Sequence, residues 1–318
     1  MVGAGASAEC GLPAGDDLKQ TIAGILGSLT SSKDIGLRHL VSTAFGQDTA
    51  NELSTVIPTF PSMDEALHYL RDREKTVLLG KAAIVDQILV AERNSRLITP
   101  GNHLRANVDA LEGTWMPNFL SMALSAVTMS DIGVAFQNVT IINFNYDRTF
   151  EHYMYAALQS KALLSPERAH SVIQNIRVIR PYGWLGGLEW SGNPKVSFGG
   201  LYADADISAL AGQIRTYTEQ AEQGLQDQIQ AVIEPAALVI FLGFGFHQQN
   251  LTLIKDRAPS ARRHKHIFGT VYGINEHNYQ ALGGRLSRNL QTGFVPQLLD
   301  MRAAELLVKL RPSIMLAD

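Results

Sequence analysis

The stretch that decides the fold is Val139–Asp147, VTIINFNYD, in which a short β-branched and apolar run is followed at once by polar residues. Such a run is typical of a strand that is buried on both faces of a sheet. Three later segments have a similar character, the last more weakly: 176–179, 237–242 and 266–272. Helical patterns separate the strands, over 149–164, over 207–233 and from about Gln248. This alternation predicts an α/β protein with a Rossmann-like parallel sheet and helices on both faces.

The N-terminal region predicts one further strand and a large block of helices. The glycine-rich segment Gly3–Ser7, GAGAS, is of the kind that follows a strand, but only Met1 and Val2 precede it, so we expect the native chain to begin earlier. An amphipathic helix is predicted from Asp16, and 31–136 is predicted to be an almost entirely helical insertion. With no repeat and no low-complexity linker, 1–318 is expected to form one domain.

Composition narrows the class of protein. Of 318 residues, 46% are hydrophobic and 18% charged, as in ordinary soluble proteins, and we expect a cytoplasmic protein without a membrane span. The net charge of −3 argues against direct binding of nucleic acid. Cys10 is the single cysteine, which excludes an internal disulfide and a zinc site built from four cysteines. No metal site is expected.

Three segments stand where ligands bind in a doubly wound fold, at the carboxyl ends of strands. In Gly3–Ser7, glycine would let backbone N–H groups approach a diphosphate, although a plain tight turn explains the same residues. Asn145 and Asp147 end the strongest predicted strand, where Asp147 could equally be the cap of the next helix. Gly243–Gly245 ends a third strand and could lie against a ribose or simply form a turn.

Taken together and in order, these motifs resemble the sirtuin superfamily, in particular its prokaryotic antiphage-defence branch. Gly3–Ser7 followed by Gly11-Leu12-Pro13 is similar to the GAGxS…GxP phosphate loop of that family, and Phe144–Asp147 is similar to the NYD motif of the branch. Gly243-Phe244-Gly245 stands in the place of the glycine motif that lines the adenosine ribose. Met63-Asp64 and 91–95 also resemble this branch.

The resemblance implies an NAD+ glycohydrolase, which cleaves the bond between nicotinamide and ribose and so depletes NAD. Asn145 would hold the nicotinamide ribose or a nearby water, and Asp147 would contact the carboxamide. NAD is then the substrate, and the residues implied to bind it are Gly3, Ala4, Gly5, Ala6, Ser7, Pro13, Asn145, Tyr146, Asp147, Gly183, Gly243, Phe244 and Gly245.

The sequence departs from the family at the catalytic base. Sirtuins have a His-Gly pair after a middle strand, and here Tyr182 precedes Gly183, with Arg180 nearby. Tyrosine, with an ordinary pKa of about 10, is a poor base at neutral pH. Three outcomes remain open: another histidine serves as base, hydrolysis is slow without one, or NAD is bound but not cleaved. The candidate substitutes are His170 and His247.

The same resemblance implies that the NAD-cleaving activity is regulated. Constitutive NAD cleavage would be toxic, so we expect activation by self-assembly into a homo-oligomer or by a partner such as a HerA-type ATPase or a short Argonaute. The apolar faces of the helical insertion are the expected contact surface.

The first alternative function is a catalytically weak or inactive subunit that binds NAD or ADP-ribose. A second alternative, a Rossmann oxidoreductase, is disfavoured because the long insertion separates the glycine loop from the next strand. The choice between NAD and NADP is open.

Overall fold

The structure, a computed structural model, is mixed α/β with small parallel sheets, and it describes residues 1–29, 35–99, 102–191, 196–201, 204–216, 224–257 and 264–315. The strand β3 (Thr140–Ile142) pairs in parallel with β4 (Arg177–Ile179). A second sheet has the order β5-β6-β7 and is also parallel; its strands are Leu238–Phe241, His266–Thr270 and Gln297–Leu299. The four strands predicted after residue 136 are confirmed, and β7 is an addition.

Val2 joins the two parallel sheets. Its N–H donates to the carbonyl of Ile142 (2.9 Å), and its own carbonyl accepts from the N–H of Phe144 (2.9 Å). On the other side, the N–H of Gly3 donates to the carbonyl of Leu242 (3.0 Å). Val2 thus forms parallel bridges to both sheets, and the strands follow the order β4, β3, Val2, β5, β6, β7. The predicted first strand is reduced to this short central contact.

Apolar cores lie on both faces of β3. Successive side chains of a strand point to opposite faces, and Ile141 and Ile142 accordingly belong to different clusters of buried residues. The cluster around Ile142 includes side chains from helices of the N-terminal half, whereas that around Ile141 includes side chains from the helices that follow β2 and from the C-terminal helix.

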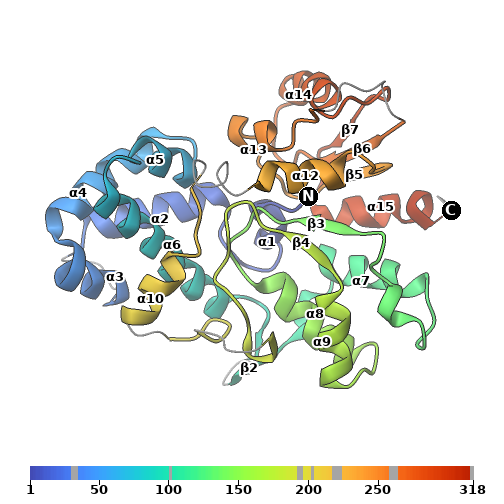
Figure 1. Ribbon diagram of the computed structural model, residues 1–318, viewed down its shortest axis with the longest axis horizontal. Helices are drawn as coiled ribbons and strands as arrows, with labels where there is room; N and C mark the ends of the chain where they lie inside the picture. The colour runs from blue at the N-terminus through green and yellow to red at the C-terminus, as the bar shows by residue number, and fades with distance from the viewer. Residues whose placement is uncertain are drawn as a thin grey trace.

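The N-terminal half is a packed group of helices at one end of the molecule (Figure 1). Its members are α2 (Gly15–Gly27), α3 (Ile35–Leu40), the π-helix η1 (Val41–Phe45), α4 (Gln47–Val56), the 3-10 turn η2 (Ile57–Thr59), α5 (Met63–Tyr69) and α6 (Glu74–Asn94). The short helix α1 (Ala4–Ala8) lies apart from this group, at the centre of the molecule. Helix α2 packs on α4 and α6, and α10 (Asp204–Ala211) returns from later in the chain to pack on α6. This group therefore combines segments from both halves of the sequence.

The segment 31–136, predicted to be almost entirely helical, also contains one short pair of strands. An antiparallel pair, β1 (Ile98–Thr99) and β2 (Asn102–Ala106), follows α6. In the sequence, Pro100 and Gly101 disfavour continuation of a helix at this point. The chain then forms the 3-10 turn η3 (Val108–Leu111), α7 (Trp115–Ser125) and the 3-10 turn η4 (Ile132–Val134), and α7 packs on the C-terminal helix α15 (Ala303–Met315).

The helices after β3 agree with prediction in one case and differ in another. The helix expected over 149–164 is α8 (Thr149–Ser160), which packs on α9 (Pro166–Gln174). The helix expected over 207–233 is interrupted after α10, where Ile214 forms an antiparallel bridge to Gly183, and α12 (Leu225–Ile233) covers its last part. The part of the expected helix over 217–223 lies outside the described residues. The described residues also form α13 (Gln248–Leu253), which begins where it was predicted, α14 (Glu276–Asn289) and the 3-10 turn η5 (Glu189–Ser191).

Candidate functional site

The three predicted segments meet at a cavity of about 560 Å³ beside the carboxyl ends of β3 and β5. This volume lies within the range of small-molecule sites. The predicted site residues that line it are Gly3, Ala4, Gly5, Ser7, Pro13, Asn145, Tyr146, Asp147, Tyr182, Gly243, Phe244, Gly245 and His247. Segments separated by more than two hundred residues in the chain are thereby brought to one place.

Three of the predicted residues lie outside this cavity lining. Ala6 is completely buried behind it, and Gly183 forms the backbone bridge to Ile214. His170 is on α9, where its ring packs edge-on against Trp190 with ring centroids 5.6 Å apart. Because none of the cavity-lining residues comes from α9, His170 is not positioned to act as a base there, which leaves His247 of the two candidates.

Gly3 and Gly243 are required because the backbones of their two segments are in direct contact. The N–H of Gly5 donates to the carbonyl of Gly243 (2.9 Å). A Cβ on Gly3 would lie 2.6 Å from that carbonyl oxygen, and a Cβ on Gly243, whose φ is +54°, would lie 2.0 Å from the nitrogen of Ala6. A side chain at either position would force the two loops apart. These glycines therefore set the shape of the cavity floor, whatever ligand they also contact.

A row of hydrogen-bonded polar side chains connects Ser7 of α1 with Asn145 and Asp147, which follow β3. Asn145 donates through Nδ2 to Ser7 Oγ (2.8 Å) and to the carbonyl of Gly3 (3.1 Å). Ser7 in turn donates to Asp147 Oδ2 (2.8 Å). The other carboxylate oxygen of Asp147 accepts from the N–H of Thr149 (3.0 Å), so Asp147 both lines the cavity and caps the first turn of α8. With both amide hydrogens of Asn145 engaged, its Oδ1 is the atom left to accept from a ligand.

Arg180, the residue after β4, donates hydrogen bonds to the backbone of the segment that carries this row. Its guanidinium donates to the backbone carbonyls of Asn145 (3.1 Å) and Asp147 (3.3 Å) and forms an ion pair with Glu151 of α8. The same group stacks over the ring of Trp184, with the guanidinium carbon 4.7 Å from the ring centroid. Arg180 therefore orients the loop that carries Asn145 and is not itself part of the cavity lining.

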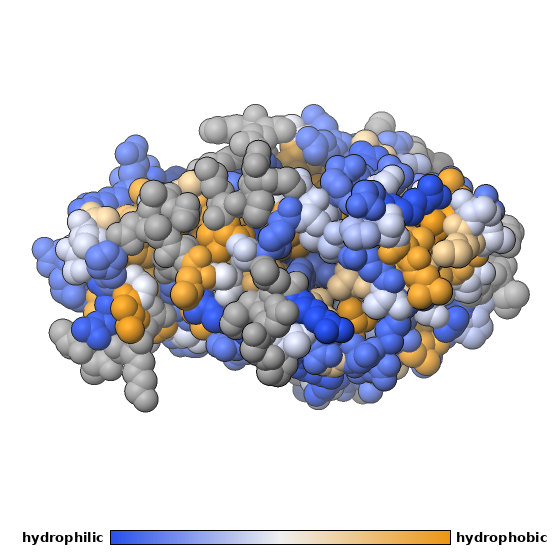
Figure 2. All heavy atoms as spheres, turned by 90° about the horizontal axis from the view of Figure 1, so that it is seen from below, coloured by the Kyte–Doolittle hydropathy of each residue, from blue (hydrophilic) through white to orange (hydrophobic). Residues whose placement is uncertain are grey.

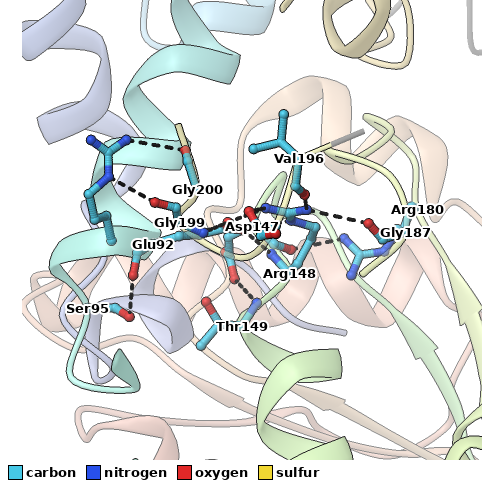
Figure 3. Close-up of polar contacts among 12 residues, drawn as sticks. Glu92, Ser95, Asp147, Arg148, Thr149, Arg180, Gly187, Val196, Gly199 and Gly200 are labelled. Carbon is cyan, nitrogen blue, oxygen red and sulfur yellow. Dashed lines mark hydrogen bonds and ion pairs between the residues drawn. The ribbon is translucent and has the colours of Figure 1, made fainter. Parts of the chain in front are cut away.

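A buried ion pair fixes the start of α8 (Figure 3). Arg148 and Glu92 are both fully buried, and Arg148 Nη2 lies 2.6 Å from Glu92 Oε2 while Arg148 Nε lies 3.1 Å from Glu92 Oε1. Arg148 Nη1 also donates to the carbonyl of Val196 (2.6 Å), and Glu92 accepts from the N–H of Gly199 (3.0 Å). Arg148, which follows Asp147, and Glu92 thus join the end of α6, the start of α8 and the segment 196–200.

Tyr182, which stands where a catalytic histidine was expected, is buried and points toward α13. Its hydroxyl donates to Asn250 Oδ1 (2.7 Å), and Asn250 Nδ2 donates to the carbonyl of Gly245 (2.9 Å). Tyr182 therefore supports the third glycine segment through Asn250. His247, at the start of α13, lines the cavity directly beside Gly245.

Sequence reasoning noted Asp64 but did not connect it to the site. Asp64 is in the first turn of α5, lines the cavity, and accepts from the hydroxyl of Tyr146 (Oδ1 to Oη 2.5 Å). Burial raises the pKa of Asp64 to about 6, against a smaller opposing effect of that hydrogen bond. Asp64 is thus an acidic group in the cavity whose protonation changes near neutral pH. No spacing pattern connects Asp64 with Tyr146, because α5 reaches the cavity only through the packing of the helical half.

No protein-family model, curated protein or solved structure matches this chain. Within the described residues, no three His, Cys, Asp or Glu side chains are grouped so that they could hold a metal ion. Among the described helices, none combines the length and the apolar composition that crossing a membrane requires.

The contact between the loops predicts a large effect of Gly243→Ala. The added methyl group overlaps the backbone of α1 and the residue keeps an unfavourable positive φ, so we expect a loss of about 2 kcal/mol or more in the free energy of unfolding. Gly24→Ala, in α2 with open space around it, should be neutral or stabilising by up to about 1 kcal/mol. Urea denaturation of the two variants measures this, and equal stabilities would contradict the assigned contact.

Glu92→Gln should lower the free energy of unfolding by about 3–5 kcal/mol, because it leaves the Arg148 guanidinium buried without a counter-charge. The double variant Glu92→Gln/Arg148→Met should recover part of this loss, since it removes the uncompensated charge. Arg73→Gln, which breaks an exposed pair with Glu52, should cost less than about 1 kcal/mol. Additive losses in the double variant would show that the two buried side chains do not interact.

The raised pKa of Asp64 predicts a pH dependence of stability. Between its unfolded pKa of 3.8 and about 6, the folded state retains a proton that the unfolded state has released, so stability falls as the pH rises through this window. Asp64→Asn should remove this contribution, and Asp48→Asn, an exposed control, should keep the wild-type slope. The measurement is the free energy of unfolding from pH 4 to pH 7, and unchanged slopes in Asp64→Asn would refute the shift.

Proposed function

We propose that this chain is a sirtuin-like NAD+ glycohydrolase that binds NAD in the cavity beside β3 and β5 and hydrolyses its bond between nicotinamide and ribose. The observation that carries the proposal is the row from Asn145 through Ser7 to Asp147, held against two glycine turns at the ends of neighbouring strands. We also infer that the order β4, β3, Val2, β5, β6, β7 is that of a Rossmann-like sheet, which favours a dinucleotide at this edge.

In the proposed reaction, the bond between ribose C1′ and the pyridinium nitrogen breaks, and its electron pair returns to the ring of the leaving nicotinamide. Water then bonds to C1′ of the oxocarbenium-like ribose and loses a proton. Asn145 Oδ1 is placed to accept from a ribose hydroxyl or from that water, and Asp147 to accept from the carboxamide. Since catalysis of this kind depends mainly on orientation and charge, a fixed polar row is well suited to it.

The proton from water needs an acceptor, and two groups of the cavity lining qualify. His247 lies beside Gly245 at the start of α13, and Asp64 lies in the first turn of α5. The raised pKa of Asp64, about 6, makes its carboxylate a stronger base than an exposed one while leaving it largely ionised at pH 7. Tyr182 is given no role as base, because its hydroxyl is committed to Asn250.

The alternative is a subunit that binds NAD or ADP-ribose without cleaving it. The observation in its favour is Tyr182, which supports the fold at the position where sirtuins place their histidine. On this reading the polar row would orient the ribose of a bound effector. The two functions differ in one measurable property, release of nicotinamide.

Activation by homo-oligomerisation or by a partner such as a HerA-type ATPase, and a cytoplasmic location, belong to the same proposal. In support of a protein contact, several large apolar side chains of the 31–136 segment are exposed, namely Ile35, Tyr69, Leu78, Met129 and Val134. Apolar patches separated by polar residues are visible on one face of the molecule (Figure 2).

The decisive measurement is release of nicotinamide from NAD by the wild-type chain and by Asn145→Ala, at several protein concentrations. We expect release by the wild type that rises more than linearly with protein concentration, and its loss in Asn145→Ala, where the polar row is interrupted. Asn51→Ala, at an exposed asparagine of α4, is the matched control and should retain full activity.

Calorimetry with NAD separates the alternatives. Binding without release in the wild type would replace the enzyme by the effector-binding subunit. Absence of binding would refute both functions.

A further inference from the structure

Arg302 is the only lysine or arginine among the described residues that line the cavity beside β3 and β5. It follows β7 and directly precedes α15, and its N–H donates to Glu305 Oε2 (2.9 Å) in the first turn of that helix. The function proposed above gives Arg302 no role, although NAD carries a negatively charged diphosphate. The position of this one cation in the cavity therefore calls for an explanation.

Three backbone donors of the N-terminal glycine-rich segment are already engaged within the protein. The N–H of Gly3 donates to the carbonyl of Leu242 (3.0 Å), and the N–H of Gly5 donates to the carbonyl of Gly243 (2.9 Å). The N–H of Ala6 donates to the carbonyl of Gly3 (2.9 Å). A bound phosphate is stabilised by several N–H donors or by a cation. Because this segment has few donors left, a cation from another part of the chain is needed.

The N-termini of α7 and α15, which would otherwise attract an anion, are capped by Glu9. Glu9 Oε2 accepts from the N–H of Trp115 (3.0 Å), and Glu9 Oε1 accepts from the N–H of Ala304 (3.1 Å). Glu9 directly follows α1, so the second bond brings the start of α15 to the end of α1. Arg302, two residues before Ala304, therefore lies close to the segment where the sequence predicts a diphosphate.

The guanidinium of Arg302 is accessible to a ligand and is restrained by its neighbour. The residue is exposed, and its guanidinium carbon lies 5.2 Å from the centroid of the Tyr272 ring, which also lines the cavity. Tyr272 follows β6, so the contact joins the loops after β6 and β7. A guanidinium that stacks on a ring keeps its N–H donors at its edge. Arg302 thus presents donors to the cavity in a limited range of directions.

The carboxylates of the cavity lining already have donors or a cation within the protein. These partners are the N–H groups of Trp115 and Ala304 for Glu9, Lys19 for Asp16, the hydroxyl of Tyr146 for Asp64, and the hydroxyl of Ser7 with the N–H of Thr149 for Asp147. Such partners offset part of each negative charge. Repulsion of an anionic ligand is reduced accordingly.

We propose that Arg302 binds a phosphate group of the dinucleotide that occupies this cavity. The inference rests on the proposed function only in taking a dinucleotide as the ligand. The planar guanidinium matches the spacing of two phosphate oxygens and forms charge-assisted hydrogen bonds with them. Two phosphate groups share this chemistry, namely the diphosphate of NAD and the 2′-phosphate that distinguishes NADP from NAD.

The test is calorimetric titration of the wild-type chain and of Arg302→Gln with adenosine, ADP, NAD and NADP. Arg302→Gln should weaken binding of the phosphate-bearing ligands by about tenfold or more and leave the affinity for adenosine unchanged. Arg302→Lys, which keeps the charge but not the planar fork, should recover part of the loss. Arg311→Gln, at an exposed arginine of α15 outside the cavity lining, is the matched control and should bind like the wild type.

The pattern of losses identifies the phosphate group. A similar loss for ADP, NAD and NADP assigns Arg302 to the diphosphate, whereas a loss confined to NADP assigns it to the 2′-phosphate. The inference is overturned if Arg302→Gln binds ADP, NAD and NADP as tightly as the wild type does, or if adenosine loses as much affinity as ADP.

Release of nicotinamide separates this inference from the proposed function. Weaker NAD binding by Arg302→Gln, with no release by the wild type, would refute cleavage and leave the role of Arg302 standing. Release that is lost in Asn145→Ala but unaltered in Arg302→Gln at limiting NAD and NADP would support cleavage and refute the role of Arg302. Absence of binding by any of the four ligands would refute both.

Discussion

The ion pair between Glu92 and Arg148 is the interaction on which the candidate site most depends. Both side chains are fully buried, and the pair with its backbone partners joins α6, the start of α8 and the segment 196–200. Burying two charges is costly, and it is offset only where the remaining donors and acceptors are also paired, as they are here. Because Arg148 directly follows Asp147, any shift of this pair moves the carboxylate that faces the cavity. Arg180 restrains the same loop from the opposite side.

A second constraint is the close approach of backbones at the centre of the sheet. Val2 forms parallel bridges to Asn143, the residue after β3, and to Leu242, the residue after β5, and the chain that follows it lies directly against Gly243. Glycine at these positions is explained by steric contact alone, so a glycine-rich segment here is not by itself evidence of a phosphate-binding loop. Asn145, Ser7 and Asp147 line the cavity and form one hydrogen-bonded row, and it is these polar side chains, not the glycines, that support the proposal of a ligand.

Local patterns predicted elements well where one residue type dominated a short stretch. The β-branched run at 139–144 and the amphipathic pattern after Asp147 correspond to β3 and α8. Prediction failed where tertiary contacts interrupt a helical pattern, as at Ile214, which pairs with Gly183, and where a short strand such as β7 has little pattern of its own. The convergence of Ser7, Asn145 and Gly243 followed from the rule that carboxyl ends of parallel strands share one edge. No such rule predicted that Asp64, on α5, would line the same cavity.

The sequence by itself determined the alternation of strands and helices and the polar residues at the strand ends, because these depend on residue type and on neighbours a few positions away. Only the tertiary structure decided that His170 lies away from the cavity and that Asp64 meets Tyr146. Contacts of this kind join residues far apart in the chain. They arise from the packing of whole helices against the sheet, which no local pattern encodes.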